Sequence, residues 1–146
     1  MPGAPTPPRA LKAEDIMTRY PVTVDSTDTV QAVADAMLVS EVRHIPIVRH
    51  GMFVGIVSDR DLRSYMLPRA ERILRPDDTR AHLDSSVELV MRSDALTVTA
   101  DTPVTALIDL LVQEKIGAVP VLAPDTRELV GVVSYLDILR VARPLF

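Results

Sequence analysis

The sequence predicts a mixed α/β fold (α+β) built from two tandem β-α-β-β-α repeats that pack about a pseudo-twofold axis. Three observations predict it: short motifs recur at a fixed offset, each repeat contains one amphipathic helix, and each contains two consecutive β-type runs joined by a turn. With 146 residues, 47% of them apolar, the chain is long enough for two small repeats that share a core.

The repeat is visible as three pairs of motifs at an offset of 74 residues. Residues 15–17, 22–24 and 45–47 match residues 89–91, 96–98 and 119–121. After the shared proline the offset becomes 76, and Gly55-Ile56-Val57-Ser58 matches Gly131-Val132-Val133-Ser134. A two-residue insertion in the second hairpin accounts for this shift.

Each repeat is predicted to begin with a short β segment, at residues 21–24 and 96–99, and to continue with a helix. We expect Asp28 to cap the first helix, with Gln31 three residues on, and Thr102 to cap the second, with Pro103 in its first turn. Apolar residues recur at i, i+3, i+4, i+7 and i+8 in both helices: Val30, Val33, Ala34, Met37 and Leu38, then Val104, Leu107, Ile108, Leu111 and Val112.

Two β runs follow in each repeat, at 45–48 and 53–57 and at 119–122 and 129–133, and a short helix begins after Ser58 and after Ser134. We expect residues 1–10 to form a disordered, proline-rich tail rather than a signal peptide. The first repeat then covers residues 11–67 and the second residues 87–142. The linker between them, 68–86, is expected to hold one helical turn at 70–75.

Composition excludes several classes of function. The net charge of −4 gives no basic footprint for nucleic acid, and the arginine-rich stretch 60–80 is nearly balanced by acidic residues, which favours a charge-paired surface. The absence of cysteine excludes thiolate catalysis, cysteine zinc sites and disulfides, and the cytoplasm is the expected compartment. No apolar run approaches a membrane span. His50 and His82 are interpreted as surface residues, and no metal site is expected.

The pattern Gly-apolar-apolar-Ser-x-x-Asp ends a strand and begins a helix in both repeats, at Ser58 and Asp61 and at Ser134 and Asp137. A helix N-terminus favours an anion such as phosphate, and an ionised aspartate accepts hydrogen bonds from the two hydroxyls of a ribose. The alternative is that Ser-x-x-Asp is only a capping box. Recurrence in both repeats keeps the ligand hypothesis level with this alternative, and the two are compatible.

The doubled order of these motifs resembles the cystathionine β-synthase (CBS) domain family over residues 11 to 142. The residues that carry the resemblance in the first repeat are Asp15-Ile16-Met17, Pro21-Val22-Thr23-Val24, Arg43-His44-Ile45-Pro46-Ile47-Val48 and Gly55-Ile56-Val57-Ser58-Asp59-Arg60-Asp61-Leu62. The resemblance implies a compact pair of domains, a homodimer in which two pairs form a disc, and clefts that bind AMP, ADP or ATP, with S-adenosylmethionine and NAD ranked below them.

The resemblance also assigns residues to two clefts. In the first, ribose contacts come from Ser134 and Asp137, base contacts from Thr18, Thr23 and Val42, and phosphate contacts from Arg43 and His44. In the second, Ser58 and Asp61 face Thr97, Ile116, Gly117 and Ala118. Arg92 stands where the first repeat has Thr18, and Gly117-Ala118 replaces Arg43-His44, so we expect unequal clefts, with the phosphorylated ligand in the Asp137 cleft.

The leading hypothesis is therefore a stand-alone sensor that binds an adenosine-type nucleotide between its repeats, requires no cofactor and regulates a separate protein effector. The alternative is a structural dimerisation module with no ligand, in which both carboxylates are helix caps. An enzyme ranks last, because no Walker loop, dinucleotide fingerprint or catalytic triad is present among five scattered glycines and three histidines.

Overall fold

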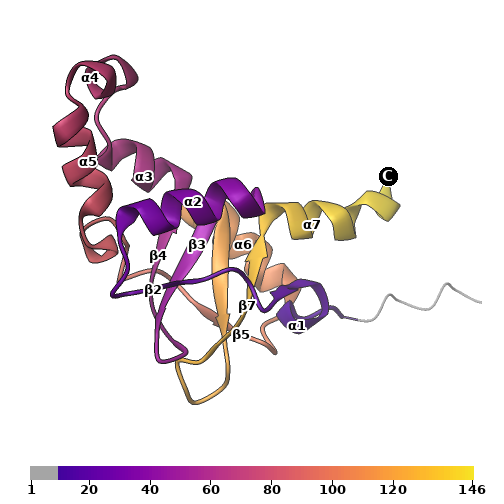
Figure 1. Cartoon of the computed structure of the whole chain (residues 1–146). Helices are drawn as coiled ribbons and strands as arrows, with labels where there is room; N and C mark the ends of the chain where they lie inside the picture. The colour runs from indigo at the N-terminus through magenta and orange to yellow at the C-terminus, as the bar shows by residue number, and fades with distance from the viewer. Residues whose placement is uncertain (1–9) are drawn as a thin grey trace, which may run out of the picture.

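A computed structural model describes residues 10–146, so the expected disordered tail lies outside the described residues except for its last position. The predicted mixed α/β architecture is confirmed (Figure 1). The elements are α1 (Ala13–Ile16), β1 (Thr18–Arg19), β2 (Val24–Asp25), α2 (Val30–Ser40), β3 (His44–Arg49), β4 (Met52–Ser58), α3 (Asp59–Tyr65), α4 (Arg69–Leu74), α5 (Pro76–Asp84), η1 (Val87–Leu89), β5 (Val98–Thr99), α6 (Val104–Glu114), β6 (Ala118–Leu122), β7 (Leu129–Ser134), α7 (Tyr135–Ala142) and η2 (Arg143–Leu145).

The strands form two sheets, ordered β2-β3-β4 and β1-β7-β6-β5. In each sheet a short strand pairs in parallel with the first strand of an antiparallel hairpin. The hairpins bulge at equivalent places, after Ile47 and after Val121. The turn is two residues longer in the second hairpin, because Val48 pairs with Phe53 whereas Leu122 pairs with Leu129. The predicted insertion is therefore confirmed.

The leading segment of each repeat packs on the sheet of the other repeat. Strand β1 pairs with β7, with Thr18 opposite Val132, and the equivalent residue Arg92 forms a bridge with Ile56 of β4. A second equivalent pair of bridges joins Lys12 to Pro103 and Thr29 to Ser86. The two halves are therefore interleaved about the predicted pseudo-twofold relationship.

Both predicted helix caps are wrong by one residue. Helix α2 is capped by Thr29, whose Oγ1 accepts a hydrogen bond from the Ala32 N–H, and the N-cap position of α6 is Pro103. The leading segments that cross to the other repeat, called the crossed segments below, explain the shift. Their β-bridges, from Lys12 to Pro103 and from Ser86 to Thr29, hold Pro103 and Thr29 in an extended conformation. The first helical N–H groups then donate to carbonyl oxygens of the partner segments: that of Val30 to Ser85 and that of Val104 to Leu11, both at 2.9 Å.

The apolar core differs from the expected single shared core. Two equivalent clusters each surround one hairpin and include residues of the crossed segments, Val87 and Val90 in the first and Ala13 in the second. A third, smaller cluster of Phe53, Ile56 and Leu122 joins the halves. The core is divided because the repeats are interleaved. The apolar face of each sheet is covered by one helix and by the leading segment of the other repeat.

The linker between the repeats is mostly helical. The expected turn at residues 70–75 is helix α4, and α5 follows at once, so that the two form an arm that projects beyond the sheets (Figure 1). Ion pairs join Arg75 to Asp78 and Arg80 to Asp84, in agreement with the expected charge pairing. His82, interpreted as a surface residue, is half-buried, because α5 folds back and places its ring edge-on to Tyr65 at 5.2 Å.

Candidate functional site

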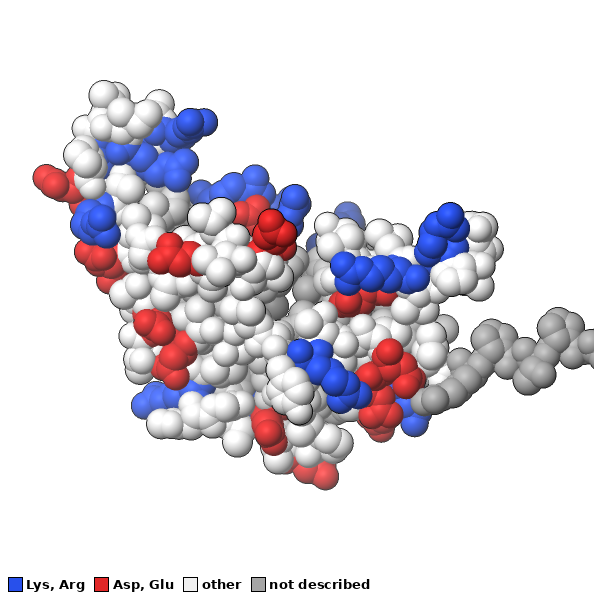
Figure 2. Space-filling model, turned by 45° about the vertical axis from the view of Figure 1, so that its right-hand side comes forward, with Lys and Arg blue, Asp and Glu red and all other residues white. Residues whose placement is uncertain are grey.

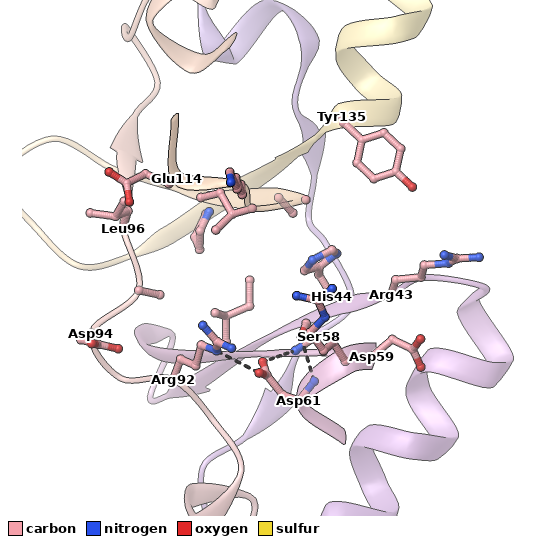
Figure 3. A pocket seen from close by; sticks show the side chains of 18 of the residues that line it. Arg43, His44, Ser58, Asp59, Asp61, Arg92, Asp94, Leu96, Glu114 and Tyr135 are labelled. Atoms are coloured by element: carbon pink, nitrogen blue, oxygen red, sulfur yellow. Dashed lines mark hydrogen bonds and ion pairs between the residues drawn. The ribbon is translucent and has the colours of Figure 1, made fainter. Parts of the chain in front are cut away.

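A cavity of about 670 Å³ lies between the two repeats, within the roughly 300–1,000 Å³ typical of small-molecule sites (Figure 3). The first repeat lines it from β3, β4 and α3, and the second from the segment after η1, from the end of α6 and from β6. Its lining residues are Arg43, His44, Ile56, Ser58, Asp59, Arg60, Asp61, Arg63, Arg92, Asp94, Ala95, Leu96, Glu114, Lys115, Ile116, Gly117, Ala118, Pro120 and Tyr135.

Ser58 and Asp61 form a capping box at the start of α3. The Ser58 N–H donates to Asp61 Oδ2 at 2.9 Å, and the Asp61 N–H donates to Ser58 Oγ at 3.0 Å. Burial alone would raise the pKa of Asp61, but the hydrogen bonds from Ser58 and the contact with Arg92 outweigh it and hold that pKa below its ordinary value. The carboxylate at the cavity wall is thus ionised at neutral pH.

Arg92 reaches this carboxylate from the second repeat. Its Nε donates to Asp61 Oδ1 at 2.9 Å, and Figure 3 shows the contact at one wall of the cavity. The backbone of Arg92 is fixed by two hydrogen bonds to Ile56. Both oxygens of Asp61 are therefore engaged, one by the Ser58 N–H and one by a guanidinium from the other repeat.

His44 lies beside this pair because β3 and β4 are antiparallel neighbours and His44 pairs with Ser58. Its ring is half-buried against Gly117, where an added Cβ would stand 2.8 Å from His44 Cε1. Burial lowers the pKa of His44, and the carboxylates of Asp61 and Asp59 oppose this in part. A side chain at position 117 would therefore force the imidazole of His44 to shift, and glycine leaves room for the ring.

Besides Asp61 and Arg92, the cavity is lined by four cationic side chains and by three carboxylates, those of Asp59, Asp94 and Glu114. Arg43, Arg60 and Lys115 line it, and none of them has an ion pair within residues 10–146. Arg63 is paired with Asp59 at 3.2 Å. Apolar surface comes from Ile56, Ala95, Leu96, Ile116 and Pro120. The cavity thus combines apolar walls with several cationic groups.

The second Ser-x-x-Asp pair is a capping box as well. The Ser134 N–H and Oγ–H donate to Asp137 Oδ2 at 2.8 and 3.2 Å, and Arg140 of the same helix lies 3.5 Å from Oδ1. Asp137 is only 7% exposed. The capping interpretation is confirmed for both aspartates, while ligand binding by either of them stays a prediction.

The structure groups the predicted site residues differently from the family-based assignment. Arg43 and His44, expected with Asp137, line the cavity of Asp61 together with Ser58, Ile116, Gly117 and Ala118. The strand register explains this, because His44 pairs with Ser58 whereas Ser134 pairs with Ala118.

The other predicted residues are not among those that line this cavity. Thr97 precedes β5, Thr18 is exposed in β1 and Thr23 is exposed before β2. Val42 lines a separate hollow of about 550 Å³ beside α2 and α3.

Twelve lining residues were not among the predicted site residues: Ile56, Asp59, Arg60, Arg63, Arg92, Asp94, Ala95, Leu96, Glu114, Lys115, Pro120 and Tyr135. A sequence signal existed for Arg92, which replaces the small Thr18 at the equivalent position. Lys115 ends α6 in a left-handed conformation with φ 54°, and its equivalent Glu41 does the same after α2. Those of the second repeat could be recognised only by knowing that the segment after η1, the end of α6 and the start of α7 face the first repeat.

Within residues 10–146, no group of three histidine, aspartate or glutamate side chains is placed to hold a metal ion. Over the same range, no helix has the length and apolar character needed to cross a membrane.

A model of the CBS domain family matches residues 13–68 and 86–143, which together make up most of the chain. The chain belongs to the CBS domain family. Its resemblance to this family, predicted from the doubled motifs, is therefore confirmed.

Solved CBS structures share the whole fold. A protein of Vibrio cholerae assigned to acetoin utilization (AcuB) is 29% identical, with 93% of each chain covered and a TM-score of 0.76. The CBS domain pair of protein MJ0100, in complex with 5′-methylthioadenosine and S-adenosyl-L-methionine, is 25% identical, with 94% of this chain and 99% of that chain covered and a TM-score of 0.74.

A curated relative is the L-aspartate semialdehyde sulfurtransferase of Methanocaldococcus jannaschii, 27% identical over 128 residues, or 87% of this chain. The chain spans only 22% of that enzyme's length, and 45% and 44% of two uncharacterized proteins of the same organism. The match therefore concerns only part of each of these longer proteins.

Proposed function

We propose that this CBS pair is a regulatory module that binds an adenosine-type nucleotide in the cavity between its repeats and thereby modulates a separate protein partner. The observation that carries the proposal is the composition of the cavity: apolar side chains suited to a purine lie beside Ser58 and Asp61, suited to a ribose, and beside cationic side chains suited to phosphates. The MJ0100 pair, which binds two adenosine derivatives, supports the ligand class.

We infer AMP, ADP and ATP as the preferred ligands, ahead of S-adenosylmethionine and NAD. Arg43, Arg60 and Lys115 have no ion pair within the described chain, so the phosphates of a nucleotide would give them anionic partners. S-adenosylmethionine carries a positive sulfonium and offers a single carboxylate in return.

Isothermal titration calorimetry with AMP, ATP, 5′-methylthioadenosine and S-adenosylmethionine tests this proposal. We expect saturable binding of AMP or ATP, and in Lys115→Asn a loss of affinity of about tenfold, the equivalent of one charge-assisted contact of about 1.4 kcal/mol. Asparagine tolerates the left-handed conformation of this position. The matched control is Glu41→Asn, at the equivalent position of α2 and outside the cavity.

Flat titrations with all four compounds, together with an unchanged melting temperature in their presence, would reject the proposal. They would favour the alternative of a structural module in which Asp61 and Asp137 only cap helices.

We further propose that the module is a homodimer that associates through its helices. Leu38 of α2 and its equivalent Val112 of α6 are 80% and 69% exposed, and Val39 and Leu139 are 82% and 58% exposed. Exposed aliphatic side chains gathered on helices are typical of an interface. Light scattering after size exclusion should give twice the chain mass of 16.0 kDa. Val39→Asp should lower it to one chain, and an unchanged dimer would contradict this interface.

A further inference from the structure

The contact between Arg92 and Asp61 distinguishes this cavity from the equivalent place in the other half. The equivalent of Arg92 is Thr18, whose short neutral side chain lies in β1 opposite Val132. Asp137, the equivalent of Asp61, is approached instead by Arg140 of its own helix, at 3.5 Å. Of these two equivalent carboxylates, Asp61 is the one that pairs with an arginine of the other repeat within residues 10–146.

The same asymmetry extends to every cationic residue that lines the cavity. At the positions equivalent to Arg43, Arg60, Arg63, Arg92 and Lys115, the other half of the chain has Gly117, Leu136, Leu139, Thr18 and Glu41. Five cationic side chains therefore line one of two geometrically related places, beside four carboxylates, and Arg92 is the cationic residue that bonds to the carboxylate expected to hold a sugar.

Binding of a sugar diol to Asp61 has a cost that follows from this geometry. Asp61 Oδ2 already accepts the Ser58 N–H, and Oδ1 accepts Arg92 Nε. Each carboxylate oxygen can accept a second hydrogen bond, so a nucleoside without phosphate must either share Asp61 with the guanidinium that lies against it or displace the guanidinium and offer it no anion in exchange. A phosphate, in contrast, is a bidentate acceptor for a guanidinium, so a phosphorylated nucleoside replaces one anionic partner of Arg92 with another.

We propose that Arg92 is the specificity residue of the cavity: its bond to Asp61 competes with the ribose of an uncharged nucleoside, and a ligand phosphate relieves this competition by drawing the guanidinium away from the carboxylate. This proposal rests on the nucleotide-binding function proposed above and adds the chemical class of the ligand. The arginine side chain is free to move in this way because it is 60% exposed, while its backbone remains anchored to Ile56.

The test compares AMP with adenosine by calorimetry in the wild type and in Arg92→Thr, which installs the residue of the equivalent position. We expect the wild type to bind AMP at least tenfold more tightly than adenosine. In Arg92→Thr this ratio should fall to about threefold or less, because AMP loses a phosphate partner while adenosine no longer competes with the guanidinium for Asp61. Arg92→Gln, which keeps the length of the side chain without its charge, should behave in the same way.

The matched control is Arg140→Thr, which removes the arginine beside the other carboxylate and lies outside the cavity. It should keep the wild-type ratio. A ratio that stays above tenfold in both Arg92 variants would overturn the role of Arg92 and leave nucleotide binding intact. Failure of both compounds to bind to any of the proteins would instead overturn AMP as a ligand, and the specificity proposal with it.

Discussion

Two equivalent glycines make the interleaving of the repeats possible, and Gly131→Ala is the substitution that tests it. A Cβ at Gly131 would stand 2.5 Å from Met17 Sδ, 2.9 Å from Met17 Cγ and 3.0 Å from the Thr18 carbonyl oxygen. The methionine side chain can move, but the carbonyl belongs to the β1–β7 pairing and moves only if that pairing loosens. The added methyl group therefore acts on the crossed segment itself.

The expected magnitude follows from two opposing terms. Overpacking of this kind costs about 1–3 kcal/mol, and the lower entropy of the unfolded chain with alanine returns about 0.4–1 kcal/mol. The net loss of unfolding free energy is then about 0.5–2 kcal/mol, or a decrease in melting temperature of roughly 2–8 °C for a chain of this size. Urea titration and thermal melting, both at fixed protein concentration, measure these two quantities.

Gly55→Ala is the matched comparison, because Gly55 occupies the equivalent place beneath Met91 and Arg92. There an added Cβ would stand 2.9 Å from Met91 Sδ and 3.1 Å from the Arg92 carbonyl oxygen, a looser fit than at Gly131. We expect a smaller loss of stability than in Gly131→Ala. An unchanged stability in Gly131→Ala, or a larger loss in Gly55→Ala, would refute the argument from close packing.

Three further predictions concern single groups. Thr29→Ala should lower the unfolding free energy by about 1 kcal/mol and Asp28→Ala by much less, as urea titration of both will show, because Thr29 is the N-cap. Asp137→Ala should cost about 1–2 kcal/mol in the same assay, since it leaves the half-buried Ser134 N–H without its acceptor. Burial holds the pKa of His44 in the folded chain below 6.5. The contribution of His44 to the unfolding free energy should therefore be fully present above pH 6.5 and should decrease as the pH drops towards the folded pKa. The unfolding free energy of His44→Gln, measured by urea titration at several pH values, should lack this component.

Most of the fold could be predicted from local sequence patterns. The two amphipathic helices begin and end near the expected residues because their apolar positions follow the helical period and face a sheet. The hairpins are equally local, since each consists of two adjacent apolar runs joined by a turn. The interleaving could not be predicted in this way, because nothing in the segment around Thr18 indicates that it pairs with Val132, more than a hundred residues later.

In the candidate site, too, the local features could be predicted from the sequence and the long-range contacts could not. Ser58 and Asp61 were found from their pattern, and the capping hydrogen bonds that this pattern encodes are local to three residues. The grouping of Arg43 and His44 with Asp61 depends on the register of a hairpin, and the predicted pairing of Ile45–Val48 with Phe53–Val57 would have been enough to obtain it. The approach of Arg92 depends on the crossed segment and required the structure.

The cavity shows how a duplicated scaffold acquires one distinct site. Backbone features are kept in both halves: the bulges, the glycines under the crossed segments, the left-handed residues that end α2 and α6, and both capping boxes. The side chains that carry charge into the cavity are not kept (Figure 2 shows basic groups gathered over the arm of α4 and α5, and basic and acidic groups interspersed elsewhere on one face of the molecule). Because the fold depends on the first set and ligand recognition on the second, exchanging Arg92 for the threonine of its equivalent position should alter binding while the interleaved fold persists.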